Sequence, residues 1–388
     1  MIGRGIGIPF RRGTGGGGTI DIPPAIKKSI IAWYSPKKQK LTNYDVIESY
    51  TEDFTNWAYR NIRGTAKITN NTIVITNVVE TNNIVEDANE PYSDLIIRVI
   101  GVTENKYLIV RQGRGKPETH IKKDGVYTFK DNNLYFGFGV SVIGECNIVI
   151  TQLPTSILKD FSGNKHDAYL YGFKGKLNSG VGTDGNLQST QVYSVNINNG
   201  SVIDVPIVSE EIFNNKEENN IYYDFGTNKD IEIDVELIAN YPNQLCYDGK
   251  SYAVAYGLPI LTDYTVVAER TWFAEKVDNG VFMSKALEQN GAFILEYKQG
   301  DRWNTYSYYS ATNINIDKDN SIVYQTKNKY NEQTIYPGDK QDTDTLFIGT
   351  IRKDDSRSFI GCHGAIIVAD RSFTEEEINW LKQNWKKI

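Results

Sequence analysis

Short runs of alternating apolar and polar residues recur along most of the chain, and this pattern predicts β-strands. Two such runs, 66–69 and 72–76, flank Asn70-Asn71 and predict a hairpin. Runs at 95–102 and 106–111 flank residues 103–105 and predict a second pair of adjacent strands. Further runs follow at 126–129, 134–138 and 147–151. Residues 48–155 therefore predict a complete antiparallel sandwich.

The second half of the chain continues the strand pattern and ends in one helix. Strands are predicted at 221–223, 231–238, 265–272, 292–297, 305–309, 346–349 and 364–369. Thr374 and Glu377 have the spacing of a capping box, and Phe373 with Ile378 forms a hydrophobic staple. Leu381 and Trp385 lie on the same helical face as Ile378, so this face is expected to pack on the sandwich.

Composition and charge exclude several classes of protein. Lys and Arg number 42 against 48 Asp and Glu, for a net charge of −6, which disfavours a general nucleic-acid binder. The longest apolar runs are too short for a membrane span, and the start lacks the apolar stretch of a signal peptide, so we expect cytoplasmic synthesis without an export address. The three cysteines are widely spaced and predict no disulfide framework.

The first eighteen residues, rich in glycine, have a pattern of their own. Isoleucine or phenylalanine stands at several even positions, so an extended chain would place these side chains on one face, with Arg11 pointing away. A flexible leader is one interpretation. The other is an anchor that docks on another protein as an added strand, followed by a glycine tether. The anchor interpretation assigns partner binding to Ile2, Arg4, Ile6, Ile8, Phe10, Arg11 and Arg12.

Three segments resemble laminin G-like, concanavalin A-type sandwiches. Residues 346–381 resemble the last strands and the terminal helix, with the helix start at Asp370–Ile378. Ile31–Ser35 resembles the opening strand, and Lys159–Ala168 the turn that usually follows it closely. The resemblance implies an all-β jelly-roll sandwich interrupted by a second one. The expected domains are an arm at 1–23, a discontinuous outer sandwich at 24–47 plus 156–388, and an inserted sandwich at 48–155.

The chain as a whole is similar to proteins encoded by phages and prophages of Bacteroidetes. The glycine-rich start and segments 32–39, 159–164, 257–266 and 342–349 carry this resemblance. It implies a virion structural protein of a head fibre, tail fibre or other appendage, localised to the virion after assembly in the host cytoplasm. The implied partners are capsid, portal or tail proteins and further copies of the chain, with a trimer favoured, and a host-surface glycan. Nucleic acid and membrane are not expected partners.

One acidic strand raises the alternative of catalysis. Glu232, Asp234 and Glu236 share a strand face, as do the carboxylates of laminarinase-type glycoside hydrolases. The neighbouring residues simply continue the same acid and apolar alternation, which is typical of a solvent-facing strand. The favoured interpretation is therefore a non-enzymatic protein without a catalytic residue.

Aromatic and acidic clusters suggest ligands other than a protein. Trp303, Tyr306 and Tyr308 could form a sugar platform, although core packing is the commoner role of such rings. A free-standing glycan-binding module thus stays open beside the virion protein. Asp317 begins a calcium-like loop, but Ile322 and Asn328 occupy the positions that need glycine and glutamate. We expect no metal and no cofactor.

Overall fold

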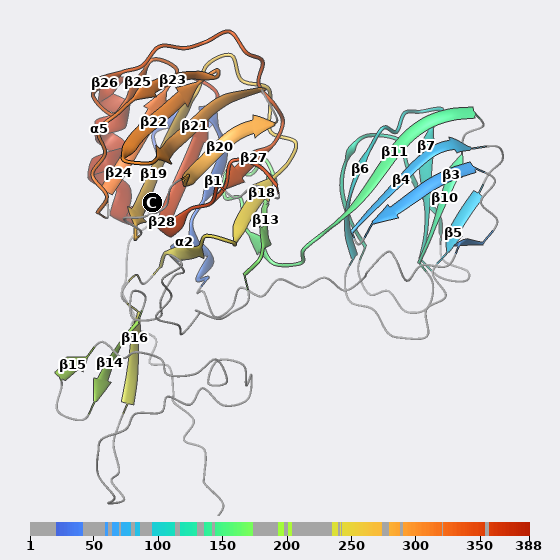
Figure 1. Cartoon of the computed structure of the whole chain (residues 1–388), viewed down its shortest axis with the longest axis horizontal. Coiled ribbons are helices and arrows are strands. Elements are labelled where there is room, and N and C mark those ends of the chain that lie inside the picture. The colour runs from blue at the N-terminus through green and yellow to red at the C-terminus, as the bar shows by residue number, and fades with distance from the viewer. Residues whose placement is uncertain are drawn as a thin grey trace, which may run out of the picture. The chain divides into compact units, whose positions relative to one another are not determined.

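The computed structural model contains two compact units, which we describe separately (Figure 1). One unit comprises Met1–Ile47 with Leu158–Ile388 and is called the outer sandwich; the other, Glu48–Ile157, is called the inserted sandwich. The structure describes residues 21–41, 59–60, 64–69, 71–78, 82–85, 95–112, 117–129, 136–141, 144–173, 193–197, 201–203, 235–239, 241, 243–273, 279–287, 290–319, 321–353 and 357–388.

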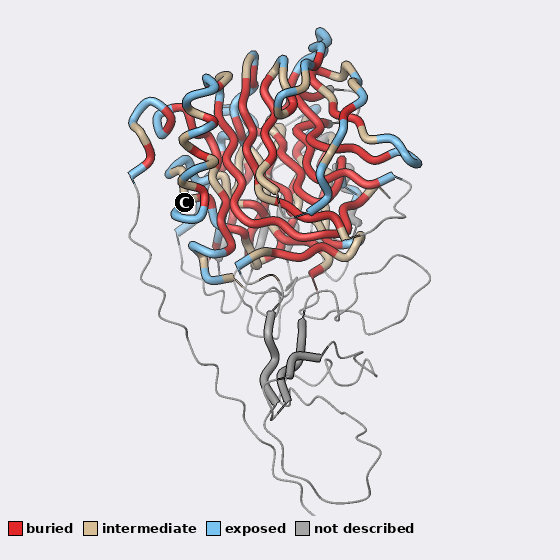
Figure 2. The backbone as a smooth tube through the Cα atoms, turned by 90° about the vertical axis from the view of Figure 1, so that its left-hand side faces the viewer, coloured by how far each residue is buried: buried red, intermediate tan, exposed pale blue. Residues whose placement is uncertain are grey.

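In its described residues the outer sandwich consists mainly of two antiparallel sheets with a core between them (Figures 1 and 2). The seven-stranded sheet contains β1 (Ile30–Tyr34), β28 (Ile360–Ala369), β19 (Thr265–Trp272), β24 (Ser321–Thr326), β25 (Lys329–Tyr330) and β26 (Gln333–Thr334) in that order, with β17 (Leu245–Asp248) also paired to β28. The eight-stranded sheet has the order β12 (Ile157–Leu158), β13 (Ala168–Tyr171), β18 (Tyr252–Ala255), β27 (Leu346–Ile348), β20 (Val281–Leu287), β21 (Asn290–Gln299), β22 (Arg302–Ser307) and β23 (Ser310–Asn313).

Helices cover the outer face of the seven-stranded sheet. The predicted C-terminal helix is confirmed as α5 (Glu375–Asn384), followed by η2 (Trp385–Lys387), and both halves of the capping box at Thr374 and Glu377 are formed. Two short helices, α1 (Pro24–Ser29) and α2 (Pro36–Gln39), precede and follow β1. The cluster beneath the helices includes Ile22, Ile26, Val267, Ile367, Phe373, Ile378, Leu381 and Trp385.

A small separate sheet belongs to the same unit. Its order is β15 (Ser201–Ile203), β14 (Tyr193–Ile197) and β16 (Val235–Ala239). The predicted strand at 231–238 thus overlaps β16, whereas residues 231–234 and the predicted strand at 221–223 lie outside the described residues.

The inserted sandwich has two five-stranded sheets. One has the order β2 (Tyr59–Arg60), β5 (Asn82–Val85), β10 (Phe136–Ser141), β7 (Tyr107–Gln112) and β8 (Thr119–Ile121). The other has the order β3 (Gly64–Thr69), β4 (Thr72–Val78), β11 (Gly144–Leu153), β6 (Leu95–Ile100) and β9 (Gly125–Phe129). The predicted hairpin on Asn70-Asn71 is confirmed, because Thr69 is the register partner of Thr72.

The predicted pairing of β6 with β7 is wrong, because these strands belong to different sheets. Strand β6 pairs with β9 and β11, whereas β7 pairs with β8 and β10. Gly101, at φ +88, follows the last residue of β6, where the chain leaves one sheet for the other. A Cβ at this position would collide with the carbonyl oxygen of Asn147. Val102 is then buried in the core, so the chain passes over the edge of the sandwich instead of folding back within one sheet.

The fold class predicted from the sequence is therefore confirmed. The protein is all-β: a jelly-roll sandwich is interrupted by a second antiparallel β-sandwich. The one helix of more than two turns in the described residues lies near the C-terminus. None of the helices in the described part of the chain is long and apolar enough to cross a membrane.

Candidate functional site

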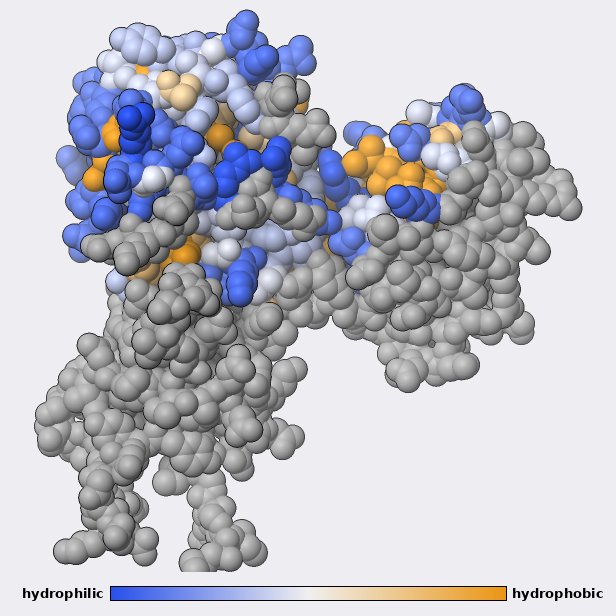
Figure 3. All heavy atoms as spheres, in the orientation of Figure 1, coloured by the Kyte–Doolittle hydropathy of each residue, from blue (hydrophilic) through white to orange (hydrophobic). Residues whose placement is uncertain are grey.

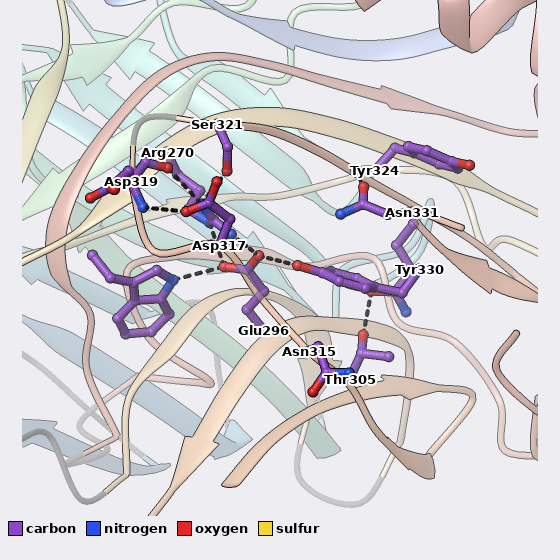
Figure 4. A network of polar contacts seen from close by, with 12 residues as sticks. Arg270, Glu296, Thr305, Asn315, Asp317, Asp319, Ser321, Tyr324, Tyr330 and Asn331 are labelled. Atoms are coloured by element: carbon purple, nitrogen blue, oxygen red, sulfur yellow. Dashed lines mark hydrogen bonds and ion pairs between the residues drawn. The ribbon is translucent and has the colours of Figure 1, made fainter. Parts of the chain in front are cut away.

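The space between the two sheets of the outer sandwich contains a buried carboxylate, that of Glu296 on β21 (Figure 4). Arg270 on β19 donates to it twice, with Nε and Nη2 each 2.6 Å from a carboxylate oxygen. Trp272 Nε1 donates at 2.7 Å and the Tyr330 hydroxyl at 2.5 Å. Four donors from the facing sheet thus converge on one carboxylate whose side chain, like that of Arg270, is 0% exposed.

A bulge in β21 aims Glu296 inward. The register of β21 against β22 shifts between Ile294 and Tyr297, and Glu296 has φ +58. The bulge allows the neighbours Leu295 and Glu296 both to face the interior, whereas Ile294 and Tyr297 lie in a separate cluster with Tyr306. A left-handed conformation costs a non-glycine residue about 1–2 kcal/mol, and the four hydrogen bonds offset that cost.

A second buried ion pair joins Lys285 on β20 to Asp342 in the loop before β27. The Lys285 Nζ lies 2.6 Å from Asp342 Oδ2 and also donates to the carbonyl of Thr343. Asp342 accepts further hydrogen bonds from the backbone N–H groups of Leu261 and Ala292. Burial lowers the pKa of Lys285 from its usual value, and the nearby Asp342 carboxylate opposes this shift.

These two carboxylates are suited to holding the fold and not to acid–base chemistry. A general acid or nucleophile must present an oxygen to a substrate, whereas Glu296 and Asp342 each direct both oxygens to protein donors. Among the described residues no group of three or more His, Cys, Asp or Glu side chains is placed to hold a metal ion.

The turn at Lys159–Ala168 also has a structural role. Asp160 Oδ1 accepts hydrogen bonds from the backbone N–H groups of Trp33 and Ser162, and Oδ2 accepts from the Ser162 hydroxyl and the His166 N–H. Asn164 Nδ2 donates to the carbonyls of Ile30 and Ile31. The turn lies between β12 and β13 of the eight-stranded sheet, and these hydrogen bonds tie it to strand β1 of the seven-stranded sheet.

The predicted sugar platform is not formed by its three rings. Trp303 and Tyr306 are three positions apart on β22, so they lie on opposite faces of the sheet: Trp303 packs against the interior core and Tyr306 against the cluster of Val281 and Ile294. Tyr308 is 6% exposed, and its hydroxyl donates to the carbonyl of Leu261. The prediction of Tyr308 as a glycan contact is therefore wrong.

Trp303 itself is occupied by protein contacts. Its ring packs edge-on against Trp272, with ring centroids 4.9 Å apart, and Lys298 Nζ lies 5.8 Å from its centroid. Trp303 therefore packs between the strands of the sandwich.

The other predicted site residues fall largely outside the described chain. Of the acidic strand, Glu232 and Asp234 are outside, and Glu236 lies on β16 opposite Asn196. The predicted anchor residues are all outside the described residues: Ile2, Arg4, Ile6, Ile8, Phe10, Arg11 and Arg12.

The segment from the end of the arm to helix α1 is fixed to the outer sandwich. Ile22 and Ile26 are buried in the cluster beneath α5. Arg371 Nη2 donates to the carbonyl of Ala25, and the same guanidinium binds the Glu377 carboxylate at 2.6 and 2.8 Å. The first described residues of the chain are therefore held by the same residues that begin the C-terminal helix.

Comparisons with known proteins give weak similarities. Neither a protein-family model nor a curated protein matches the chain. Among solved structures, Trypanosoma rangeli sialidase in complex with sialic acid aligns at 10% identity with a TM-score of 0.29, over 83% of this chain and 62% of that one. The full extracellular region of zebrafish Gpr126/Adgrg6 aligns at 9% identity and 0.24, over 80% of this chain and 37% of that one.

A truncated AlyQ with CBM32 and alginate lyase domains aligns at 11% identity with a TM-score of 0.21, over 81% of this chain and 99% of that one. At these TM-scores the backbones of the three proteins do not follow the backbone of this chain as a whole. We therefore base no statement about ligand or activity on them.

Proposed function

We propose that this chain is a structural component of a bacteriophage virion, such as a fibre or another appendage, and that it has no enzymatic activity. Residues 1–12 attach it to a capsid, portal or tail protein, and the β-sandwiches are displayed outward. The chain assembles in the host cytoplasm as a homo-oligomer, with a trimer favoured.

The observation that carries this proposal is the use of the buried carboxylates in the outer sandwich. The side chains of Glu296 and Asp342 are fully buried, and both bind donors of the protein itself. A sandwich built in this way supports a role as a rigid body better than a role as a catalyst.

The attachment part of the proposal rests on the fixed segment beside the arm. Because Ile22 and Ile26 are packed under α5, the chain is held to the body of the sandwich directly after residues 1–20. The apolar even positions of the arm then suit an added strand on a partner sheet, in which backbone hydrogen bonds give affinity.

A fusion tests whether the arm is sufficient for attachment. Residues 1–23 are joined to a monomeric fluorescent protein and mixed with virions purified from the phage that encodes the chain. We expect the fusion to sediment with the particles, the Ile6→Asp/Ile8→Asp fusion to stay in solution, and the control fusion with Asp21→Asn, a substitution at an exposed residue outside the predicted anchor, to sediment normally. Equal behaviour of all three fusions would contradict the proposal.

We propose that the displayed β-sandwiches contact the host surface and its glycans. The face of the outer sandwich seen in Figure 3 is mainly hydrophilic where it is described, and the exposed large apolar side chains of the described residues are Ile260 and Tyr336. The test is a glycan array probed with the full chain, together with an assay of reducing ends released from the bound glycans. Binding without release of reducing ends is the expected result, and release would restore the glycoside hydrolase alternative.

A further inference from the structure

Two cysteines that are far apart in the sequence are direct neighbours in the outer sandwich. Cys246 lies on β17 and Cys362 on β28, and the two are register partners in this antiparallel pair. Both are thiols in the structure. The third cysteine, Cys146, lies in the inserted sandwich.

The side chains of the pair point to the same face of the seven-stranded sheet. Their neighbours on β17, Leu245 and Tyr247, are part of the interior core, so the alternation of the strand turns Cys246 to the outer face. His363 contacts Tyr247 and Phe282 on the interior side, so Cys362 also points outward. Residues that are directly opposed in antiparallel strands have Cα atoms about 4.5 or 5.5 Å apart, within the range of about 4.4–6.8 Å found for disulfides.

The two thiols already interact. Burial raises the pKa of the Cys362 thiol, and a hydrogen bond with Cys246 raises it further. Cys362 Sγ also donates to Gln244 Oε1 at 2.8 Å. The geometric basis for a disulfide is the register pairing of Cys246 with Cys362, which places their Cα atoms in the range that a disulfide bridges.

We propose that Cys246 and Cys362 are a cross-strand disulfide site that closes when the protein meets a low-molecular-weight disulfide such as oxidised glutathione. One thiolate attacks the small disulfide, forms a mixed disulfide and releases one thiol. The second cysteine then displaces the other thiol, so that two protein thiols and one disulfide become one protein disulfide and two small thiols. This inference does not depend on the proposed function.

The position of β17 explains how a buried pair can react. Cys246 and Cys362 are 4% and 0% exposed, so the closed structure protects them. In the described part of the sheet, however, β17 is a four-residue strand whose only neighbour is β28. Short edge strands open locally more often than central ones, and opening of β17 exposes both thiols together. We therefore expect the reaction to be slow in native buffer and faster in mild denaturant.

The test uses the full chain with Cys146→Ser, which removes the third thiol. The reduced protein is incubated with oxidised glutathione, with and without urea below the unfolding midpoint, then denatured and alkylated. We expect a product that has lost the mass of two hydrogen atoms, takes no alkyl group and yields a peptide pair joined through Cys246 and Cys362. Its melting temperature is expected to rise and to return to the reduced value with dithiothreitol.

The matched variants are Cys246→Ser and Cys362→Ser in the same background. Each lacks the second thiol, so we expect a glutathione mixed disulfide that persists on the remaining cysteine. The inference is overturned if the protein with both cysteines also accumulates stable glutathione adducts, or if both thiols remain open to alkylation after refolding with oxidised glutathione. Circular dichroism verifies that each variant is folded, and alanine replaces serine where it is not.

Discussion

In the inserted sandwich the buried side chains of the described residues are almost all aliphatic, whereas the outer sandwich buries two ion pairs. The inserted core includes Ile73, Ile97, Val99, Ile148 and Ile150, and the single polar residue buried in its described part is Gln152. The outer sandwich buries Arg270 with Glu296 and Lys285 with Asp342 at 0% side-chain exposure.

This difference separates two ways of stabilising the same type of fold. An aliphatic core is stabilised by apolar burial and tolerates shifts between similar packings. Buried charges cost free energy unless every partner is in place, so they favour one register of one sheet on the other. The Glu296 network, which joins β19, β21 and β25, thus fixes how the two sheets of the outer sandwich face each other.

The largest effect is expected from Glu296→Gln. It leaves the Arg270 guanidinium buried without a counter-charge, which should lower the free energy of unfolding of the outer sandwich by about 3–5 kcal/mol. Urea titration measures this loss of unfolding free energy. In a separate calorimetric scan, the thermal transition of the inserted sandwich should not move. Glu376→Gln, on an exposed residue of α5, is the matched control and should change little. An equal effect of the two substitutions would contradict the structural role of the network.

A core substitution in the inserted sandwich should reverse the pattern. Ile97 is 0% exposed, and Ile97→Ala should lower the free energy of unfolding of that unit alone by about 2–5 kcal/mol, since it removes apolar contacts and leaves a cavity. Ile100→Ala, three residues along the same strand and only half-buried, should cost less. A matching loss in the outer sandwich would show that the units do not unfold separately.

Acid should weaken the outer sandwich through His363. Its ring accepts a hydrogen bond from Tyr247 and donates one to the carbonyl of Gly364, and burial lowers its pKa from 6.5 to about 4. Between these values the unfolded chain binds a proton that the folded chain does not. Stability should therefore fall by about 3 kcal/mol as the pH drops from 6.5 to 4.

The measurement for His363 is the slope of unfolding free energy against pH. His363→Gln should flatten that slope even if it lowers stability at pH 7, whereas His120→Gln, on an exposed side chain of the inserted sandwich, should keep it. A slope that survives His363→Gln would assign the acid sensitivity to other groups.

The smallest effect is expected at the helix cap. Thr374→Ala removes the acceptor for the Glu377 N–H and should cost the outer sandwich about 1 kcal/mol, while Thr374→Ser should retain most of that stability. Thermal unfolding of the three proteins measures the difference. Equal melting temperatures would mean that the C-terminal helix is held by its apolar face alone.

Local patterns predicted much of the fold and little of the candidate site. Alternation located the strands of the inserted core, and the spacing of Thr374 and Glu377 located the C-terminal helix, because both signals act between neighbours in the sequence. The partner sheet of β6 was mispredicted, because a hairpin and a crossing between sheets have similar turn residues.

The long-range features had no such signal. The inward position of Glu296 depends on a bulge that strand alternation does not reveal, and the contact of Cys246 with Cys362 depends on which strands become neighbours. The error of combining the three rings in one platform was avoidable. Strand parity alone places Trp303 and Tyr306 on opposite faces, so the three rings could not have formed one platform on a regular strand.

The most direct test of the proposed attachment is co-sedimentation of the full chain with virions of the phage that we propose encodes it, compared with a chain that lacks residues 1–18. The shortened chain keeps Ile22 and Ile26 and should fold, which circular dichroism checks. The account predicts that the full chain sediments with the particles and that the shortened chain stays in solution as a folded protein. Equal sedimentation of the two chains, or none by either, would contradict attachment through the arm.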